Sequence, residues 1–176
     1  GIGKYINNKK IQFKKYKLKN ICQIKIIDNL LYLLDCKQDK ILIMDNENFN
    51  VERIINLFFF FFKWIDWSNN WWLGDSNGRI YCFDNNWVPI GFWRVPKELK
   101  KSNIYGGSNK NGKLYLNCNY NIYILDLPKD KIYSKIIKKI PICFNSNFTI
   151  DKDGVWGIHK NKIIKCKLKN KKYIKK

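Results

Sequence analysis

The chain has 176 residues, 45% of them apolar and 16% aromatic, which is enough for one folded domain and excludes wholesale disorder. Its 34 lysine and arginine residues against 14 acidic residues give a formal net charge of +20, with only three arginines. The longest unbroken apolar run, Leu57–Phe62, is far shorter than the roughly 20 residues of a membrane-spanning helix, so we expect no membrane span.

The predicted elements begin with one strand at Ile11–Leu18 and continue as a fourfold repeat. In each repeat a polar turn precedes an alternating apolar run, which is closed by aspartate in three of the four. The runs are Lys40–Asp45, Arg79–Asp84, Asn121–Asp126 and Lys162–Lys167. Their last residues are 39, 42 and 41 positions apart, and a period of about 40 residues is typical of a four-stranded propeller blade.

Three further strands are predicted around each closing run, because period-2 alternation and β-branched or aromatic residues dominate. Inner strands are expected near Ile21–Ile27, Phe58–Ile65, Ile104–Gly106 and Ile142–Ile150. Second strands are expected at Leu30–Leu34, Trp71–Leu73, Leu114–Leu116 and Val155–Ile158. Outer strands are expected at Val51–Leu57, Val88–Val95 and Ile132–Ile137. The fold class is therefore all-β, a propeller of about four four-stranded blades.

Expected domain boundaries follow from these strands. We predict one domain over residues 1–176, with approximate blades at 20–57, 58–96, 103–139 and 140–176. The fourth blade lacks an obvious outer strand, since the residues after Lys167 are densely charged. Because propellers avoid exposed edges, we expect the strand at 11–18 to close the blade that contains Lys162–Lys167.

The second repeat, Leu73–Asp84, resembles the end of a WD40 repeat, in which a small-residue turn leads into an apolar strand ending in Trp-Asp. Phe83-Asp84, Met44-Asp45 and Leu125-Asp126 occupy the Trp-Asp position, whereas Cys166-Lys167 departs from it. The Gly-His pair of the family is absent, so its Asp-His-Ser/Thr-Trp network cannot form. The resemblance implies a WD40-like propeller that binds partners. Since most such propellers have seven blades, four blades imply a small, reduced or partial ring.

No catalytic, metal-binding or cofactor-binding pattern accompanies the repeats. The sequence has no P-loop, G-x-G-x-x-G or G-x-S-x-G motif, and a Cys–His pair would have to use the single histidine, His159. Six cysteines without a C-x-x-C spacing indicate free, mostly buried thiols in a reducing compartment. We therefore expect no enzyme, cofactor, metal or small-molecule substrate, and a location in the cytoplasm, with the mitochondrion as the alternative.

Lysines are dense at both ends of the chain, and their charge would attract a phosphate backbone without reading its sequence. Nucleotide bias is the competing explanation, because lysine has A/T-rich codons and alanine is absent from the chain. The candidate nucleic-acid-binding residues are Lys9, Lys10, Lys14, Lys15, Lys17, Lys165, Lys167, Lys169, Lys171 and Lys172.

Tryptophan is also abundant, and six of the seven lie between Trp64 and Trp93. Most should fill the core, while Trp67 and Trp87, next to polar turns, are candidate anchors for a protein partner. The sequence thus predicts a non-catalytic binding module of a ribonucleoprotein assembly, such as a ribosome. This module would contact RNA through lysines and other protein subunits through aromatics. The alternative is a protein–protein scaffold subunit without RNA contact.

Overall fold

The computed structural model describes residues 2–6, 9–14, 16–57, 62–119, 121–142, 144, 148–150, 154–160 and 162–167. For residues 2–6 and 9–14, and for His159 and Lys167, it describes the backbone alone. The chain divides into two compact units, Gly1–Phe61 and Phe62–Lys176. Apart from one short 3-10 helix, the regular structure of the described residues is β-strand, which confirms the all-β prediction.

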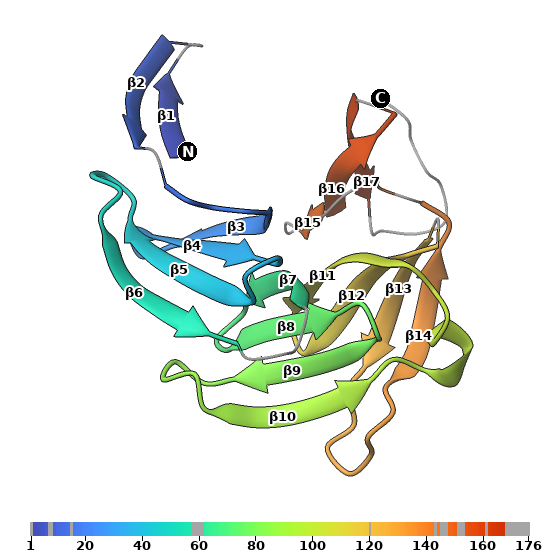
Figure 1. The fold of residues 1–176 in the computed structure, drawn as a ribbon. Coiled ribbons are helices and arrows are strands. Elements are labelled where there is room, and N and C mark those ends of the chain that lie inside the picture. Colours follow the sequence, from blue (N-terminus) through green and yellow to red (C-terminus); the bar gives the residue numbers. More distant parts are fainter. Residues whose placement is uncertain are drawn as a thin grey trace. The chain divides into compact units, whose positions relative to one another are not determined.

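The first unit contains a hairpin and a four-stranded antiparallel sheet with sequential strand order (Figure 1). The hairpin strands are β1 (Ile2–Ile6) and β2 (Lys9–Lys14), and the sheet strands are β3 (Ile21–Ile27), β4 (Leu30–Asp35), β5 (Lys40–Asp45) and β6 (Val51–Asn56). Its core is formed by Leu31, Leu33, Leu42, Met44 and Phe49. Asp28 and Asn29, which join β3 to β4, both have positive φ, as a tight two-residue hairpin requires.

The side chain of Asp35, at the end of β4, connects the segment before β3 to the turn after β4. Its fully buried carboxylate accepts backbone N–H groups from Lys19, Asn20, Lys37 and Gln38 at 2.9–3.2 Å. Burial alone would raise the pKa of Asp35, but these backbone hydrogen bonds outweigh it and lower that pKa. The carboxylate of Asp35 therefore has a structural role in the first unit.

The cysteine prediction needs a correction in this unit. Cys22 and Cys36 form a disulfide, with their Cα atoms 6.0 Å apart. The register of β3 and β4 pairs Ile21 with Asp35, which brings the two cysteines together. The prediction of free, buried thiols applies to Cys82 and Cys118, and it was wrong for this pair.

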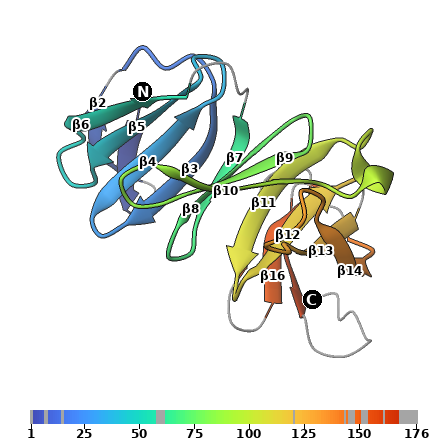
Figure 2. The same ribbon diagram turned by 90° about the horizontal axis from the view of Figure 1, so that it is seen from below.

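The second unit contains three antiparallel sheets. The first consists of β7 (Phe62–Trp67), β8 (Trp71–Asp75), β9 (Arg79–Phe83) and β10 (Pro89–Arg94); the second of β11 (Ile104–Lys110), β12 (Lys113–Cys118), β13 (Asn121–Asp126) and β14 (Lys135–Ile140); and the third of β15 (Phe148–Ile150), β16 (Gly154–His159) and β17 (Lys162–Lys167). The 3-10 helix η1 (Lys97–Leu99) follows β10. Strand β11 packs beside β7, as Figures 1 and 2 both show.

Two of the aspartates that end the closing runs shape the turns that follow. Oδ1 of Asp45 accepts the backbone N–H groups of Glu47 and Asn48, and Oδ1 of Asp84 accepts those of Asn86 and Val88. A carboxylate that satisfies amides two to four residues ahead fixes a tight connection to the next strand. This role explains why aspartate recurs at the end of the run.

One hydrophobic core cluster of the second unit contains Trp64, which is 1% exposed. Its indole ring lies against Gly74 on β8 and Gly107 on β11, where an added Cβ would come within 2.1 and 2.6 Å of ring atoms. Glycine at position 107 therefore allows the inner strand β11 to pass close to the Trp64 ring. Phe58–Phe61, expected to begin this inner strand, lie outside the described residues, and β7 begins at the buried Phe62.

Three strand predictions differ from the structure or stay open. The inner strand expected near Ile142–Ile150 is β15 at Phe148–Ile150, and Ile142 is not part of a strand. Outer strand β14 begins at Lys135 rather than Ile132, because Ile132 and Ser134 hydrogen-bond to Arg94 of β10. Strand β2 pairs with β1, and β15–β17 form a three-stranded sheet in the described residues. The closing role of residues 11–18, like the single domain over 1–176, stays a prediction.

Candidate binding groove

The connection between β13 and β14 is hydrogen-bonded to β10, the outer strand of the neighbouring sheet. The backbone N–H of Arg94 donates to the Ile132 carbonyl at 2.7 Å, and the N–H of Ser134 donates to the Arg94 carbonyl at 2.9 Å. The Ser134 hydroxyl adds a second donor to the same carbonyl at 2.9 Å. These bonds form a short parallel bridge between Arg94 and Tyr133, so the connection is held at a defined place beside β10.

A groove of about 670 Å³ lies between β10 and this connection. Its apolar lining comes from β8, β9, β10 and the connection, and the charged lining residues that the structure describes all belong to the connection. Its lining includes Trp72, Cys82, Gly91, Trp93, Lys129, Asp130, Lys131 and Ile132. Its volume is in the range of small-ligand and peptide side-chain pockets.

Trp93 forms one wall of the groove and is fixed on three sides. Its ring stacks on Trp72 with centroids 5.8 Å apart, and its indole N–H donates to the Pro128 carbonyl at 2.9 Å. A Cβ on Gly91 would come within 2.3 Å of the Trp93 ring, so glycine is required for this packing. The indole N–H of Trp72 is buried and has no acceptor among the described residues.

Cys82, on β9, is part of the groove lining and is buried. Burial raises the pKa of its thiol to about 11, so the thiol stays protonated near neutral pH. A neutral, buried thiol is a poor nucleophile and a poor metal ligand. Cys82 therefore contributes an uncharged, buried side chain to the groove.

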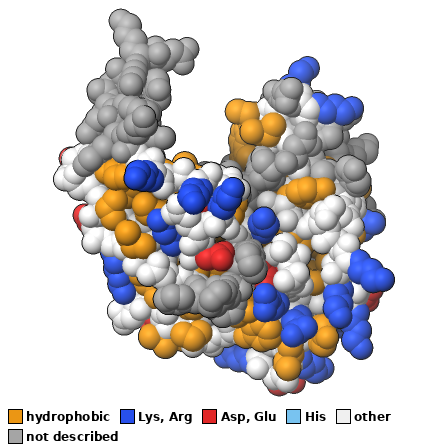
Figure 3. All heavy atoms as spheres, in the orientation of Figure 1, with side chains coloured by type: hydrophobic (Ala, Val, Ile, Leu, Met, Phe, Trp, Pro, Cys, Tyr) orange, Lys and Arg blue, Asp and Glu red, His pale blue; other side chains and the backbone are white. Residues whose placement is uncertain are grey.

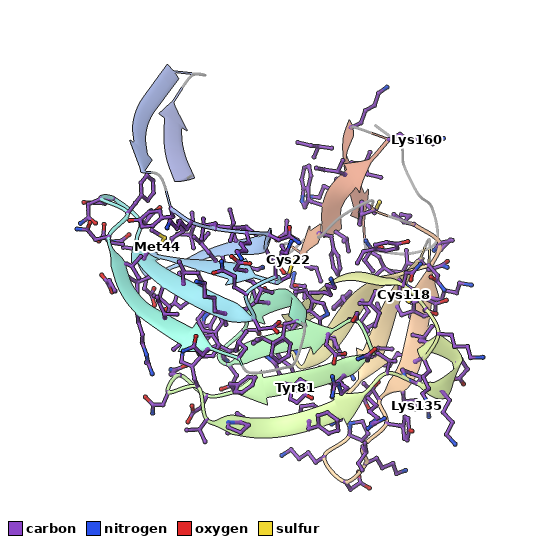
Figure 4. All side chains as sticks on the ribbon, viewed as in Figure 1. Cys22, Met44, Tyr81, Cys118, Lys135 and Lys160 are labelled. Atoms are coloured by element: carbon purple, nitrogen blue, oxygen red, sulfur yellow. A yellow bond between two sulfur atoms is a disulfide. The ribbon has the colours of Figure 1, made fainter. Side chains whose placement is uncertain are left out.

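The surface next to the groove is basic. Residues 94–139 contain eleven lysines and arginines but three acidic residues. On β14, Lys135, Lys138 and Lys139 are exposed, and Figure 4 marks Lys135 at the start of the strand. Figure 3 shows Lys and Arg side chains distributed over the surface around this sheet. A negatively charged partner would therefore be attracted to this sheet.

Trp67 and Trp87, the predicted partner anchors, belong to a different face of the β7–β10 sheet. Both are partly buried, and their rings lie 4.9 Å from the ring of the buried Trp71, with Trp87 stacked on it. Phe83 extends this cluster at 6.2 Å from Trp87. The two tryptophans thus have a packing role in the structure, and their contact with a partner stays a prediction.

The predicted nucleic-acid-binding lysines are described in part. Lys17 is exposed, and Lys165 is partly buried with its Nζ 4.7 Å from the centroid of the Trp156 ring. Lys9, Lys10 and Lys14 belong to β2 and Lys167 to β17, where the structure describes the backbone alone. Lys15, Lys169, Lys171 and Lys172 lie outside the described residues. Their joint role therefore stays a prediction.

Sequence reasoning missed the groove residues. Lys129 and Lys131 lie in a short turn that reads as an ordinary linker, and Ile132 was assigned to the following strand. The residue in the sequence that could have indicated the groove is Trp93, but the sequence predicts a core position for it. Within the described ranges no cluster of three or more His, Cys, Asp and Glu side chains could hold a metal ion, and no helix there is long and apolar enough to cross a membrane.

Comparison with known proteins supports the fold. No protein-family model matches the chain, and no curated protein matches it in sequence. Among solved structures, it is similar to the Cps50 (Swd1) β-propeller domain of Myceliophteria thermophila (11% identity, TM-score 0.54, 84% of this chain and 51% of that one). It is also similar to a chain of the Mitotic Checkpoint Complex (12%, 0.57, 91% and 52%) and to the glutaminyl cyclase of Myxococcus xanthus (10%, 0.60, 80% and 62%).

These likenesses show a WD40-like β-propeller fold, which confirms the fold predicted from the repeat. The chain spans less than two thirds of each of these three structures' chains. One of the three is an enzyme and another comes from a multi-protein complex, so the fold by itself does not fix the activity.

Proposed function

We propose that this chain is a non-catalytic protein-interaction module of a larger assembly, and that the groove between β10 and the β13–β14 connection holds its partner. The observation that carries this proposal is the groove itself, which has an apolar lining and basic residues at one side. The connection is fixed by backbone hydrogen bonds, so the groove does not have to be ordered when a partner binds. Propeller folds commonly serve as binding modules, which agrees with this use.

Exposed apolar side chains around the groove support a protein partner. Ile132 and Ile90 are 58% and 55% exposed, and Phe92 is 38% exposed. Large apolar side chains that remain exposed next to a concave site are typical of protein-binding surfaces. Burying them against a partner would yield about 25 cal/mol per Å² of apolar area before the costs of association are subtracted.

Replacing Ile132 by asparagine tests the proposal. An unbiased display library of short peptides is expected to yield peptides that bind the full chain, and Ile132→Asn should weaken that binding about tenfold, because a polar group replaces an exposed groove side chain. The matched control is Ile137→Asn on β14, since Ile137 is 51% exposed but does not line the groove. Binding should be measured by fluorescence anisotropy with the enriched peptides. Equal weakening by both variants would contradict the proposal.

A ribonucleoprotein assembly, such as a ribosome, is the second candidate, and the net charge of +20 favours it. The exposed lysines of β14 and the lysines at the chain ends would contact phosphate groups without reading sequence. If the library yields no peptide while mixed-sequence RNA binds and is released steeply by salt, the RNA candidate replaces the protein one. A cytoplasmic or mitochondrial location belongs to the same proposal.

A further inference from the structure

We propose that the groove receives an extended acidic segment of a partner protein, anchored by one large aliphatic or aromatic side chain. This inference rests on the proposed function and names the chemistry of its partner. It follows from the lining, the charge at the rim, the state of the Trp93 ring and the open edge of β10.

The lining selects an apolar anchor. Trp72 and Trp93 form a stacked pair, Cys82 is a neutral thiol, and Ile132 extends the apolar surface to the rim. A side chain such as leucine, isoleucine or phenylalanine would exchange water for these groups when it enters. Central apolar anchors in rigid pockets usually supply most of the binding energy of a peptide interface.

The charge at the rim selects acidic neighbours for that anchor. Lys129 and Lys131 line the groove and are exposed, whereas Asp130 between them is the one acidic lining residue in the part of the chain that the structure describes. Arg94 of β10 does not line the groove, and its contribution is the backbone hydrogen bonding that holds the connection in place. Carboxylates that flank the anchor would therefore meet an excess of positive charge.

The state of the Trp93 ring disfavours a nucleic-acid base as the anchor. Proteins that bind single-stranded RNA offer aromatic faces on which bases stack. Here Trp72 covers one side of the Trp93 ring, Gly91 packs against the ring, and its N–H is already bonded to the Pro128 carbonyl. The ring acts as a wall of the groove rather than as a stacking platform.

The outer edge of β10 favours an extended segment. One edge of β10 pairs with β9 through Pro89–Arg94, and on the other edge the structure describes backbone pairing at Arg94 alone. A peptide in β conformation can add to such an edge and place alternate side chains into the groove. Backbone hydrogen bonds between the peptide and β10 would supply affinity, and the groove would select the anchor side chain.

A synthetic peptide array tests this chemistry on the full chain. Each peptide has about 12 residues, one central anchor (Leu, Phe or Ala) and a background of Ser with Glu, Gln or Lys. Peptides with a Leu or Phe anchor in the Glu background should bind about tenfold more tightly than peptides with the same anchor in the Gln background. Replacing the anchor by Ala in the Glu background should weaken binding by a similar factor. Lys129→Glu together with Lys131→Glu should reverse the preference, so that the Lys background binds best.

The matched control carries Lys138→Glu and Lys139→Glu on β14, which change the net charge equally at exposed positions outside the lining. This control should keep the preference for Glu. The inference is overturned if the Glu and Gln backgrounds bind equally, or if both double variants reverse the preference.

The two proposals fail differently. If the unbiased library yields neutral apolar peptides whose binding depends on Ile132, the protein-interaction module stands and the acidic segment is wrong. If no peptide binds and mixed-sequence RNA binds through Lys129 and Lys131, both proposals are wrong.

Discussion

Replacing Trp64 by alanine is expected to lower the free energy of unfolding by about 3–5 kcal/mol. Trp64 is among the largest fully buried side chains of the described residues, and it fills the space between β8 and β11 in the second unit. Its removal would leave a cavity between strands whose facing residues, Gly74 and Gly107, have no side chains to fill it. The measurement is denaturant unfolding followed by far-UV circular dichroism.

A second substitution makes this result specific. Gly107→Ala should be costly in the natural chain, because its Cβ would come within 2.6 Å of the Trp64 ring. In the Trp64→Ala background the same methyl group would enter the cavity, so it should cost much less. The two effects should therefore be strongly non-additive. Additive effects would show that the tryptophan and the glycine are not packed together in solution.

Replacing Asp66 by alanine is expected to cost about 2–4 kcal/mol, the second large effect. Asp66 on β7 is 4% exposed, and its Oδ2 accepts the Ser108 hydroxyl and the backbone N–H of Asn109, both at 2.7 Å. These bonds join the inner strands β7 and β11. Without the carboxylate, two buried donors would lose this acceptor, and a buried unpaired donor is costly.

Asp126 provides the control for Asp66. Its carboxylate pairs with Lys113 at 2.9 Å, and both side chains are close to half exposed. Exposed ion pairs usually contribute about 0–1 kcal/mol, so Asp126→Ala should change stability little. Denaturant unfolding of both variants under the same conditions gives the comparison. If the two losses are equal, the bond between β7 and β11 does not carry the role assigned to it.

The fold was largely predictable because its determinants are local. Alternation with period 2 indicates strands, and the aspartates Asp45 and Asp84 at the ends of two closing runs shape the turns that follow them. The start of β14 was not predictable in the same way. Ile132 continues the apolar pattern, but its carbonyl accepts a hydrogen bond from Arg94 of another sheet. The two residues are 38 positions apart, so the local sequence pattern does not indicate this contact.

The candidate site was not predictable for a related reason. Its walls come from Trp72, Trp93 and Ile132, which only the packing of two neighbouring sheets brings together. Charge was a poor guide, because lysines are spread over so much of the chain that their density does not single out Lys129 and Lys131. The disulfide was missed because the register of β3 and β4, rather than a spacing motif, brings Cys22 to Cys36.

The most direct test of the central claim, that the groove is the partner-binding surface, is hydrogen–deuterium exchange of the full chain with and without a saturating peptide from the library. We expect slower exchange in β10, Pro89–Arg94, and in the connection at residues 127–134 when the peptide binds, because a bound segment covers these amides. The backbone amides of Lys138 and Lys139 should exchange at the same rate with and without the peptide. Protection confined to other strands, with the amides of β10 and the connection unchanged, would contradict the claim.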